Sequence, residues 1–207
     1  MDEHLEPGAS LVYKFERYIN SDFVEEKLLR VSIPVDIKIS GVFFSESRVA
    51  NNTIEGFHRV FLDSTAVVYT GSSSFLLKAD KLIAESGSRI ESGPWSQAAS
   101  GAGANGAPIN IYSLQAEGEQ ELLSRGQDGA PGKHGGPGFN GGNSSPVTLT
   151  IREAAPDFKL NLNALAGNGG AGGHRRKNRK HRAWGANGDA GAMSEFTIKI
   201  GDSLAFL

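Results

Sequence analysis

A run of basic residues between two glycine-rich stretches carries the clearest binding chemistry in this chain. Residues 174–184 read HRRKNRKHRAW, with six Lys or Arg, two His and one Trp. Guanidinium and ammonium groups bind phosphate, sulfate and carboxylate, and an indole ring stacks on a base or a sugar. The candidate ligand-binding residues are Arg175, Arg176, Lys177, Arg179, Lys180, Arg182 and Trp184. The expected partner is an anionic polysaccharide or cell-surface glycan, with nucleic acid as the alternative.

The same run also fits two less specific interpretations. It could be a solvated loop whose like charges keep the chain soluble, or a localisation signal, since short basic runs are a weak motif. The chain of 207 residues has a net charge of −2, and the remainder carries −8 once the six cations are set aside. Such asymmetry indicates an element that faces a polyanion.

Residue types that support catalysis or metal binding are present, but not at the spacings that such sites need. The chain has no Cys, which excludes disulfides and thiolate metal sites. Its five histidines form no H-E-x-x-H pattern, and no G-x-S-x-G elbow or GxxxxGK[ST] phosphate loop occurs. His58 is interpreted as a polar strand residue rather than as a base paired with Asp63. Asp128 and Asp189 could recruit Ca²⁺, although the G-G-x-G-x-D pattern is absent. We therefore expect a protein that is not an enzyme and has no metal or cofactor.

A unit of regular length recurs in the second part of the chain. Strands are predicted to begin at Phe75, Ile109, Val147 and Phe196, which lie 34, 38 and 49 residues apart. Without the 11 residues 174–184 the last interval becomes 38, so the basic run is predicted to be a loop inserted into one repeat. A fixed period of this size predicts stacked repeats, an architecture that usually provides scaffolds and binding surfaces.

Glycines recur at every third position between these strands. They are Gly126, Gly129, Gly132, Gly135, Gly138 and Gly141, then Gly167, Gly170 and Gly173, then Gly185, Gly188 and Gly191. Three residues per turn is the period of polyproline II, and a missing Cβ lets another backbone approach closely. Two packings fit, a collagen triple helix of three chains and a bundle within one chain. The interrupting strands and the few prolines favour the bundle. A disordered linker is the alternative, but a linker has no reason to keep its phase across an insertion.

One segment resembles a coil of the filamentous-haemagglutinin type of β-solenoid. Residues 75–93 read FLLKADKLIAESGSRIESG, in which a strand is followed by A-D-x-(I/L) and then by G-(S/A)-x-I. The resemblance implies a β-helical or stacked-sheet surface protein and carries no catalytic residues. In pattern alone, the glycine tracts are similar to polyproline II bundles of the N-terminal domain of Obg GTPases and of some phage tail-tip adhesins.

Composition divides the chain near residue 70. Residues 1–70 are expected to form a β-rich N-terminal or capping domain, and residues 71–207 a repeat domain of strand pairs and Gly-x-x tracts with the inserted basic loop. Strands are predicted at 11–15, 31–39, 42–44, 56–62 and 66–69, and a helix at 22–30. Pro34 indicates an edge strand or a bulge. The expected fold class is all-β, with β-solenoid-like strand pairs beside packed polyproline II segments.

These features predict a non-enzymatic structural or adhesive module that presents loops to an anionic glycan or polymer. The alternatives are a self-associating subunit of a filament or coat, a nucleic-acid-binding module, and an ice-binding surface. No apolar run is long enough to span a bilayer as a helix, so no membrane-spanning helix is expected. Residues 1–6 read MDEHLE, which is acidic where a signal peptide is basic. We expect an extracellular, cell-surface or virion location, with the leader either removed or not required.

Overall fold

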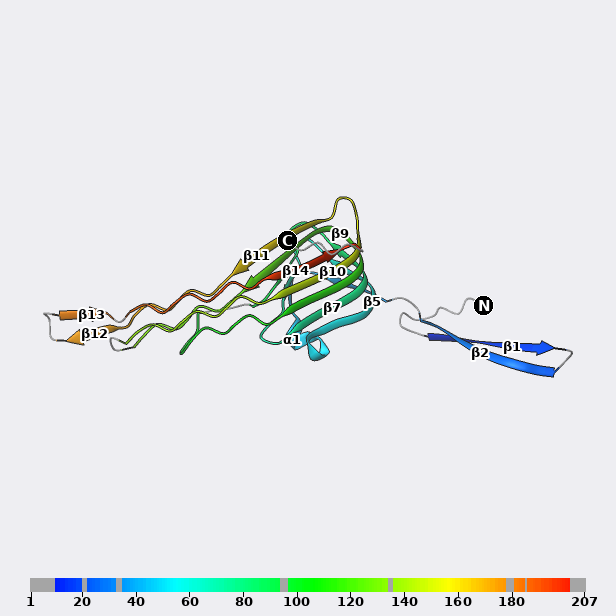
Figure 1. Cartoon of the computed structure of the whole chain (residues 1–207), viewed down its shortest axis with the longest axis horizontal. Helices are drawn as coiled ribbons and strands as arrows, with labels where there is room; N and C mark the ends of the chain where they lie inside the picture. The colour runs from blue at the N-terminus through cyan, green and yellow to red at the C-terminus, as the bar shows by residue number, and fades with distance from the viewer. Residues whose placement is uncertain are drawn as a thin grey trace.

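The chain is all-β, and most of its strands run parallel to one another (Figure 1). The computed structural model describes residues 10–19, 22–32, 35–93, 97–133, 136–177, 181–184 and 186–201. Within 10–32 and 174–184 the description is that of the backbone and its pairing. No helix in the described parts of the chain is long and apolar enough to cross a membrane.

The strands are rich in the β-branched, aliphatic and aromatic residues that fit a half-buried pleated surface. They are β1 (Ser10–Ile19), β2 (Asp22–Ser32), β3 (Asp36–Ile39), β4 (Val42–Phe44), β5 (Thr53–Leu62), β6 (Val67–Tyr69), β7 (Phe75–Ala84), β8 (Arg89–Glu91), β9 (Ile109–Arg125), β10 (Val147–Ala154), β11 (Lys159–Leu165), β12 (His174–Lys177), β13 (His181–Trp184) and β14 (Phe196–Ile200). A helical turn, α1 (Ser45–Arg48), and a 3-10 turn, η1 (Ala50–Asn52), separate β4 from β5.

Two parallel ladders form the main sheet and meet in β9. The first ladder runs β3-β5-β7-β9-β10-β14, and the second contains β4-β6-β8-β9 with β11 also paired to β9. The 17-residue β9 belongs to both, because its first half pairs with β7 and β10 and its second half with β8 and β11. Gly118 separates the halves with a φ of +86°, and a Cβ there would lie 2.0 Å from Ala84 O. The bend therefore requires glycine.

The four strand starts predicted from the repeat are neighbours in the first ladder. Phe75 is the register partner of Ile109, Ile109 of Val147, and Val147 of Phe196. The intervals read from the sequence are thus the intervals at which the strands stack, and these four strands are confirmed. Stacking also aligns the core, because buried aliphatic side chains follow one another from strand to strand. One such column contains Leu77, Ile111 and Leu149.

The main sheet continues across residue 70, where a domain boundary was expected. Asp36 is the register partner of Arg59, and Arg59 of Lys81, so these strands stack at shorter intervals than the later ones. The expected boundary lies between β6 and β7, two strands of this sheet. The early strand pairs resemble the later ones but are followed by short connections instead of glycine tracts. The change in composition near residue 70 thus coincides with a change in the length of the connections between strand pairs.

Two local predictions near the start of the chain are wrong. The helix expected at 22–30 is the strand β2, which pairs antiparallel with β1 from Asp22 to Ser32. Backbone pairing with a neighbouring strand here overrides the helix preference of Glu, Lys and Leu. The single strand expected at 31–39 is two strands, since β2 ends at Ser32 and β3 begins at Asp36; Pro34 lies outside the described residues. The strand expected at 42–44 is confirmed with the same bounds, and those expected at 11–15, 56–62 and 66–69 are confirmed with different bounds.

Glycine-rich tracts extend together away from the sheet (Figure 1). We name them tract 1 (98–106), tract 2 (126–132), tract 3 (136–144), tract 4 (166–173) and tract 5 (186–194). Backbone hydrogen bonds of 2.8–3.0 Å join them at every third residue, within one chain. Gly126, Gly129 and Gly132 donate to Leu165, Asn168 and Ala171, and Gly138, Gly141 and Ser144 donate to Ala186, Asp189 and Ala192.

The glycine series that starts at Gly126 does not continue as one straight tract. The chain reverses between Lys133 and Gly136, and the Gly136 N–H donates to Lys133 O at 2.9 Å. Tracts 2 and 3 consequently run antiparallel and bond to each other, with Gly142 N–H donating to Gln127 O. The connection from β9 to β10 thus leaves the sheet by one tract and returns by another.

Candidate functional site

The basic run forms a β-hairpin at the tip of the tract bundle. β12 and β13 pair antiparallel, with His174 opposite Trp184 and Lys177 opposite His181. The hairpin joins tract 4 to tract 5, whose backbones are bonded to each other by Gly188 N–H to Gly170 O at 2.9 Å. In the preceding repeat, tracts 2 and 3 are joined by the tight reversal near Lys133. The hairpin thus takes the place of a tight turn, at the end of the bundle away from the main sheet (Figure 1).

The backbone gathers most of the predicted ligand-binding residues in this hairpin. Arg175, Arg176 and Lys177 belong to β12, and Arg182 and Trp184 belong to β13. The register sets Arg176 opposite Arg182. Arg179 and Lys180 lie outside the described residues.

The tracts that carry the hairpin are packed to the limit of backbone contact. A Cβ on Gly170 would lie 2.0 Å from Ala130 O, and one on Gly188 would lie 2.1 Å from Phe139 O. These distances are far below van der Waals contact, so side chains are excluded at these positions. Glycine loses more conformational entropy on ordering than other residues, and the lateral hydrogen bonds offset that loss.

Polar side chains add a second set of bonds between tracts. Asn140 Oδ1 accepts from Asp189 N–H at 3.0 Å, and Asn143 Oδ1 accepts from Ala192 N–H at 2.8 Å. Asp128 Oδ1 accepts from the backbone N–H of Asn168 at 2.7 Å. Asp128, a candidate Ca²⁺ ligand from the sequence, thus bonds to a neighbouring tract. In the described parts of the chain, no three His, Asp or Glu residues cluster as a metal site would require.

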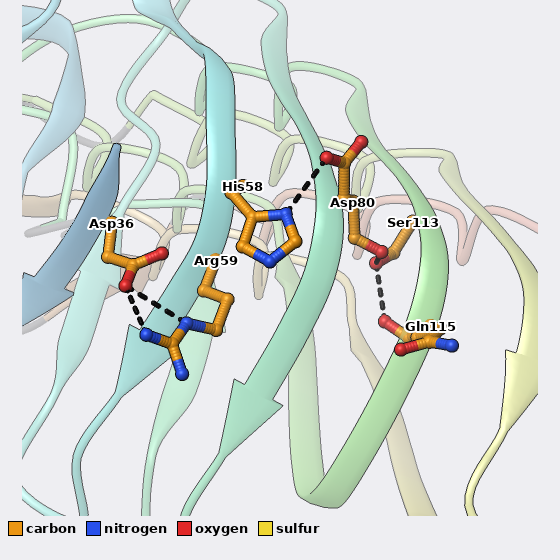
Figure 2. A network of polar contacts seen from close by, with 6 residues as sticks. All are labelled: Asp36, His58, Arg59, Asp80, Ser113 and Gln115. Atoms are coloured by element: carbon orange, nitrogen blue, oxygen red, sulfur yellow. Dashed lines mark hydrogen bonds and ion pairs between the residues drawn. The ribbon is translucent and has the colours of Figure 1, made fainter. Parts of the chain in front are cut away.

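A polar network crosses the outer face of the first ladder (Figure 2). His58 on β5 turns toward Asp80 on β7, and its Nδ1 lies 3.1 Å from Asp80 Oδ2, the geometry of an N–H donating to a carboxylate. Arg59 donates to Asp36 from Nε at 3.0 Å and also from Nη2. This hydrogen bond to Arg59 lowers the pKa of the Asp36 carboxyl and raises the pKa of the guanidinium.

The His58–Asp80 pair has the arrangement in which a carboxylate orients a general base. Ser113 is the nearest labelled hydroxyl in Figure 2, and its Oγ donates to the Gln115 carbonyl at 2.6 Å. Among the described residues no hydroxyl is hydrogen-bonded to His58. As predicted, His58 is an exposed polar residue of a strand, and 48% of its side chain is accessible.

Asp63, which is near His58 in sequence, stabilises a turn by hydrogen bonds instead of pairing with His58. Its carboxylate accepts from Ser40 Oγ, from Thr65 Oγ1 at 2.7 Å and from the Thr65 N–H at 3.0 Å. Lys38 Nζ lies 3.7 Å away. The hydroxyl hydrogen bonds, with the Thr65 amide and the Lys38 charge, lower the pKa of Asp63 to about 2.

The same outer face holds a groove that sequence reasoning missed. It encloses about 920 Å³ over β5, β7, β9 and β10, and its lining includes Lys78, Tyr112, Leu114 and Arg152. The sequence feature that indicates the groove is the segment INIYSL at 109–114. Its alternate residues Ile109, Ile111 and Ser113 point into the core, which leaves Tyr112 and Leu114 on the outer face.

Comparison of the chain with protein-family models, with curated proteins and with solved structures finds no match. The likeness to filamentous-haemagglutinin coils therefore stays a prediction.

Proposed function

We propose that this chain is a non-enzymatic structural and adhesive module that presents the basic hairpin 174–184 to an anionic glycan or polymer. The observation that carries the proposal is the position of the hairpin, which replaces a tight turn at the tip of a bundle of bonded tracts. Insertions in repeat proteins map to loops on one face, often the binding face. Holding the hairpin on an ordered arm reduces the entropy lost when a ligand binds.

The proposal extends to the architecture of the main sheet and of the tracts. The main sheet is a β-solenoid-like stack of strand pairs, supported by strand starts that are register partners over four strands. The tracts are polyproline II segments, supported by lateral hydrogen bonds at every third residue. An arm of this kind suits a protein at a cell surface, in the extracellular space or on a virion, and we place the chain there.

Binding to a panel of anionic polymers tests the proposal. The panel contains a sulfated glycan, lipopolysaccharide and single-stranded DNA, each measured at low and high salt. The intact chain is compared with one in which 174–184 is replaced by a short Gly-Ser bridge. We expect salt-sensitive binding that is lost in the bridged form, with sulfated glycan preferred; preference for DNA would instead identify a nucleic-acid-binding module. Equal binding by both chains, or none, would contradict the proposal.

A second candidate function, self-association as a filament or coat subunit, is supported by β4. Within the described part of the chain, β4 pairs with β6 alone, and two of its apolar side chains are accessible, Val42 by 54% and Phe44 by 42%. An apolar edge strand is a template for pairing with another chain. Light scattering should then show concentration-dependent oligomers that Val42→Lys dissolves, whereas a monomer at all concentrations would remove this candidate.

A further inference from the structure

The groove on the outer face of the first ladder has an aromatic ring in its lining. Tyr112 is 40% exposed and Leu114 is 50% exposed, although both lie in β9, a strand with neighbours on each side. They are two residues apart, so they project from the same face. An exposed tyrosine in a hollow of the molecule offers a flat surface on which an apolar ring face can stack.

Cations lie on both strands that neighbour β9. Lys78 on β7 is the register partner of Tyr112, and Arg152 lies on β10, two residues after Thr150, the register partner of Tyr112 on that side. Both line the groove and both are exposed. Among the described residues neither has a hydrogen-bond or ion-pair partner. Two cations without such a partner in the same groove as an aromatic ring provide a site for an acidic group on the same ligand.

The groove is also lined by polar groups of β5 and β7, besides the hydroxyls of Ser113 and Thr150. Asp80 is engaged by His58, and Glu55 precedes Gly56 at a bulge where the β5–β7 register shifts. A Cβ at Gly56 would meet nothing within 4 Å, so the groove is open at this place. Tyr112 and Arg152 thus lie on β9 and β10, His58 lies on β5, and β7 between them carries both Lys78 and Asp80.

We propose that this groove binds a linear acidic oligosaccharide, with one pyranose ring on Tyr112 and its carboxylate between Lys78 and Arg152. Hydroxyls of the next unit face His58 and Asp80. Neighbouring strands are about 4.8 Å apart, a spacing close to the length of one sugar unit, so a chain that crosses the strands meets a new side chain at each unit. The site goes beyond the function proposed for the hairpin, because it uses other residues on another part of the molecule.

Titration calorimetry with a galacturonic acid oligomer tests the inference. It is done on the full chain and on a full chain whose six hairpin Lys and Arg are replaced by Gln, so that the groove can be measured alone. We expect both chains to bind, and we expect Tyr112→Ala to weaken binding by about tenfold or more. The Lys78→Ala/Arg152→Ala double variant should bind as weakly. Tyr112→Phe keeps the ring and should stay within about threefold of the parent.

Lys159→Ala, an exposed cation on β11 outside the groove, is the matched control and should bind like the parent. Because the substituted side chains are exposed, circular dichroism should show unchanged folding. Loss of oligomer binding in the neutral-hairpin chain would overturn the groove site, while heparin binding by the intact chain would leave the hairpin function standing. Equal effects of Lys159→Ala and of the groove variants would also overturn it. Binding of a polyglutamate peptide in place of the sugar would overturn the ligand class.

Discussion

Gly141 illustrates why glycine recurs at every third position of the tracts. A Cβ at this residue would lie 2.0 Å from Gly167 O, a backbone atom that cannot move without breaking the bonds of tract 4. The three-residue period in the sequence is therefore the period at which each tract contacts its neighbours. Other positions of the triplets also face a neighbouring tract, since a Cβ at Gly142 would lie 1.9 Å from Ala104 O, and Asp128 and Asn140 accept hydrogen bonds from amides of the next tract.

Substitution of Gly141 by Ala should consequently destabilise the chain far more than the same change at Gly136. At Gly136 the nearest atom to a new Cβ is Lys133 O at 3.0 Å, which requires only a small shift. We expect a loss of about 3 kcal/mol or more for Gly141→Ala and about 1 kcal/mol or less for Gly136→Ala. Urea denaturation of the three chains measures both values, and similar losses would contradict the packing described for the tracts.

Asp63 makes stability depend on pH at the turn that follows β5. Its pKa is lowered to about 2 in the folded chain, mainly by the hydroxyls of Ser40 and Thr65, while an unfolded Asp titrates near a pKa of about 3.9. The folded state thus favours the charged form, and this contribution is fully present above the unfolded pKa and is lost as pH falls through the folded pKa.

The free energy of unfolding of the parent chain should therefore exceed that of Asp63→Asn by a constant amount at pH 5 to 7. The difference should shrink as pH falls from about 4 to about 2. Denaturation of both chains across this range provides the measurement. A difference that stays the same down to pH 2 would show that the carboxylate charge contributes nothing.

At the scale of elements, the sequence predicted the repeated part of the fold well and the start of the chain poorly. Phe75, Ile109, Val147 and Phe196 could be found because each begins an apolar run, and because stacked strands must recur at the interval of the repeat. The strand pairs before residue 70 could not be recognised as copies of the repeat, because their connections are shorter and contain no glycine tract. β2 could not be predicted because pairing with β1 decides its conformation.

The basic segment 174–184 could be predicted in part, because its composition and its place between glycine tracts are visible in the sequence. The composition of 174–184 indicates polyanion binding, and the phase of the glycines identifies it as an insertion. The sequence does not show that this insertion is a hairpin at the tip of the bundle. The tip is the place where a tract reverses, and the reversal between tracts 2 and 3 is hidden in the sequence because the glycine period continues across it. The outward Tyr112 and Leu114 are visible in the sequence, but the groove itself forms only where strands β5, β7, β9 and β10 lie side by side.

If the hairpin is an addition to the bundle, its removal should leave the remaining elements intact. Tract 4 and tract 5 are bonded to each other and to tract 3 without it, through Gly188, Gly170 and Gly173. Replacing 174–184 by a short Gly-Ser bridge should leave the melting temperature and the far-ultraviolet circular dichroism spectrum of the chain almost unchanged. A clear drop in melting temperature would show instead that the hairpin holds the tracts together.

At the scale of the whole molecule, the parallel sheet and the tracts have different roles in one design. The sheet buries the aliphatic columns that stabilise the fold. The tracts extend from the sheet and hold the hairpin at their far end, and they are joined to one another by backbone hydrogen bonds and a few polar side chains. The charge distribution is uneven as well, because segment 174–184 holds six cations while the rest of the chain has a net negative charge. The long-range field thus attracts a polyanion toward this segment.

The measurement that tests this account most directly is the salt dependence of heparin binding by the intact chain and by the chain with six hairpin Lys and Arg replaced by Gln. Neutralising cations by a polyanion releases counterions, so the logarithm of the binding constant falls with the logarithm of salt concentration. We predict at least about a tenfold weakening from low to physiological salt for the intact chain, and little binding at any salt for the neutral hairpin. Equal affinity and equal salt dependence of the two chains would contradict the account.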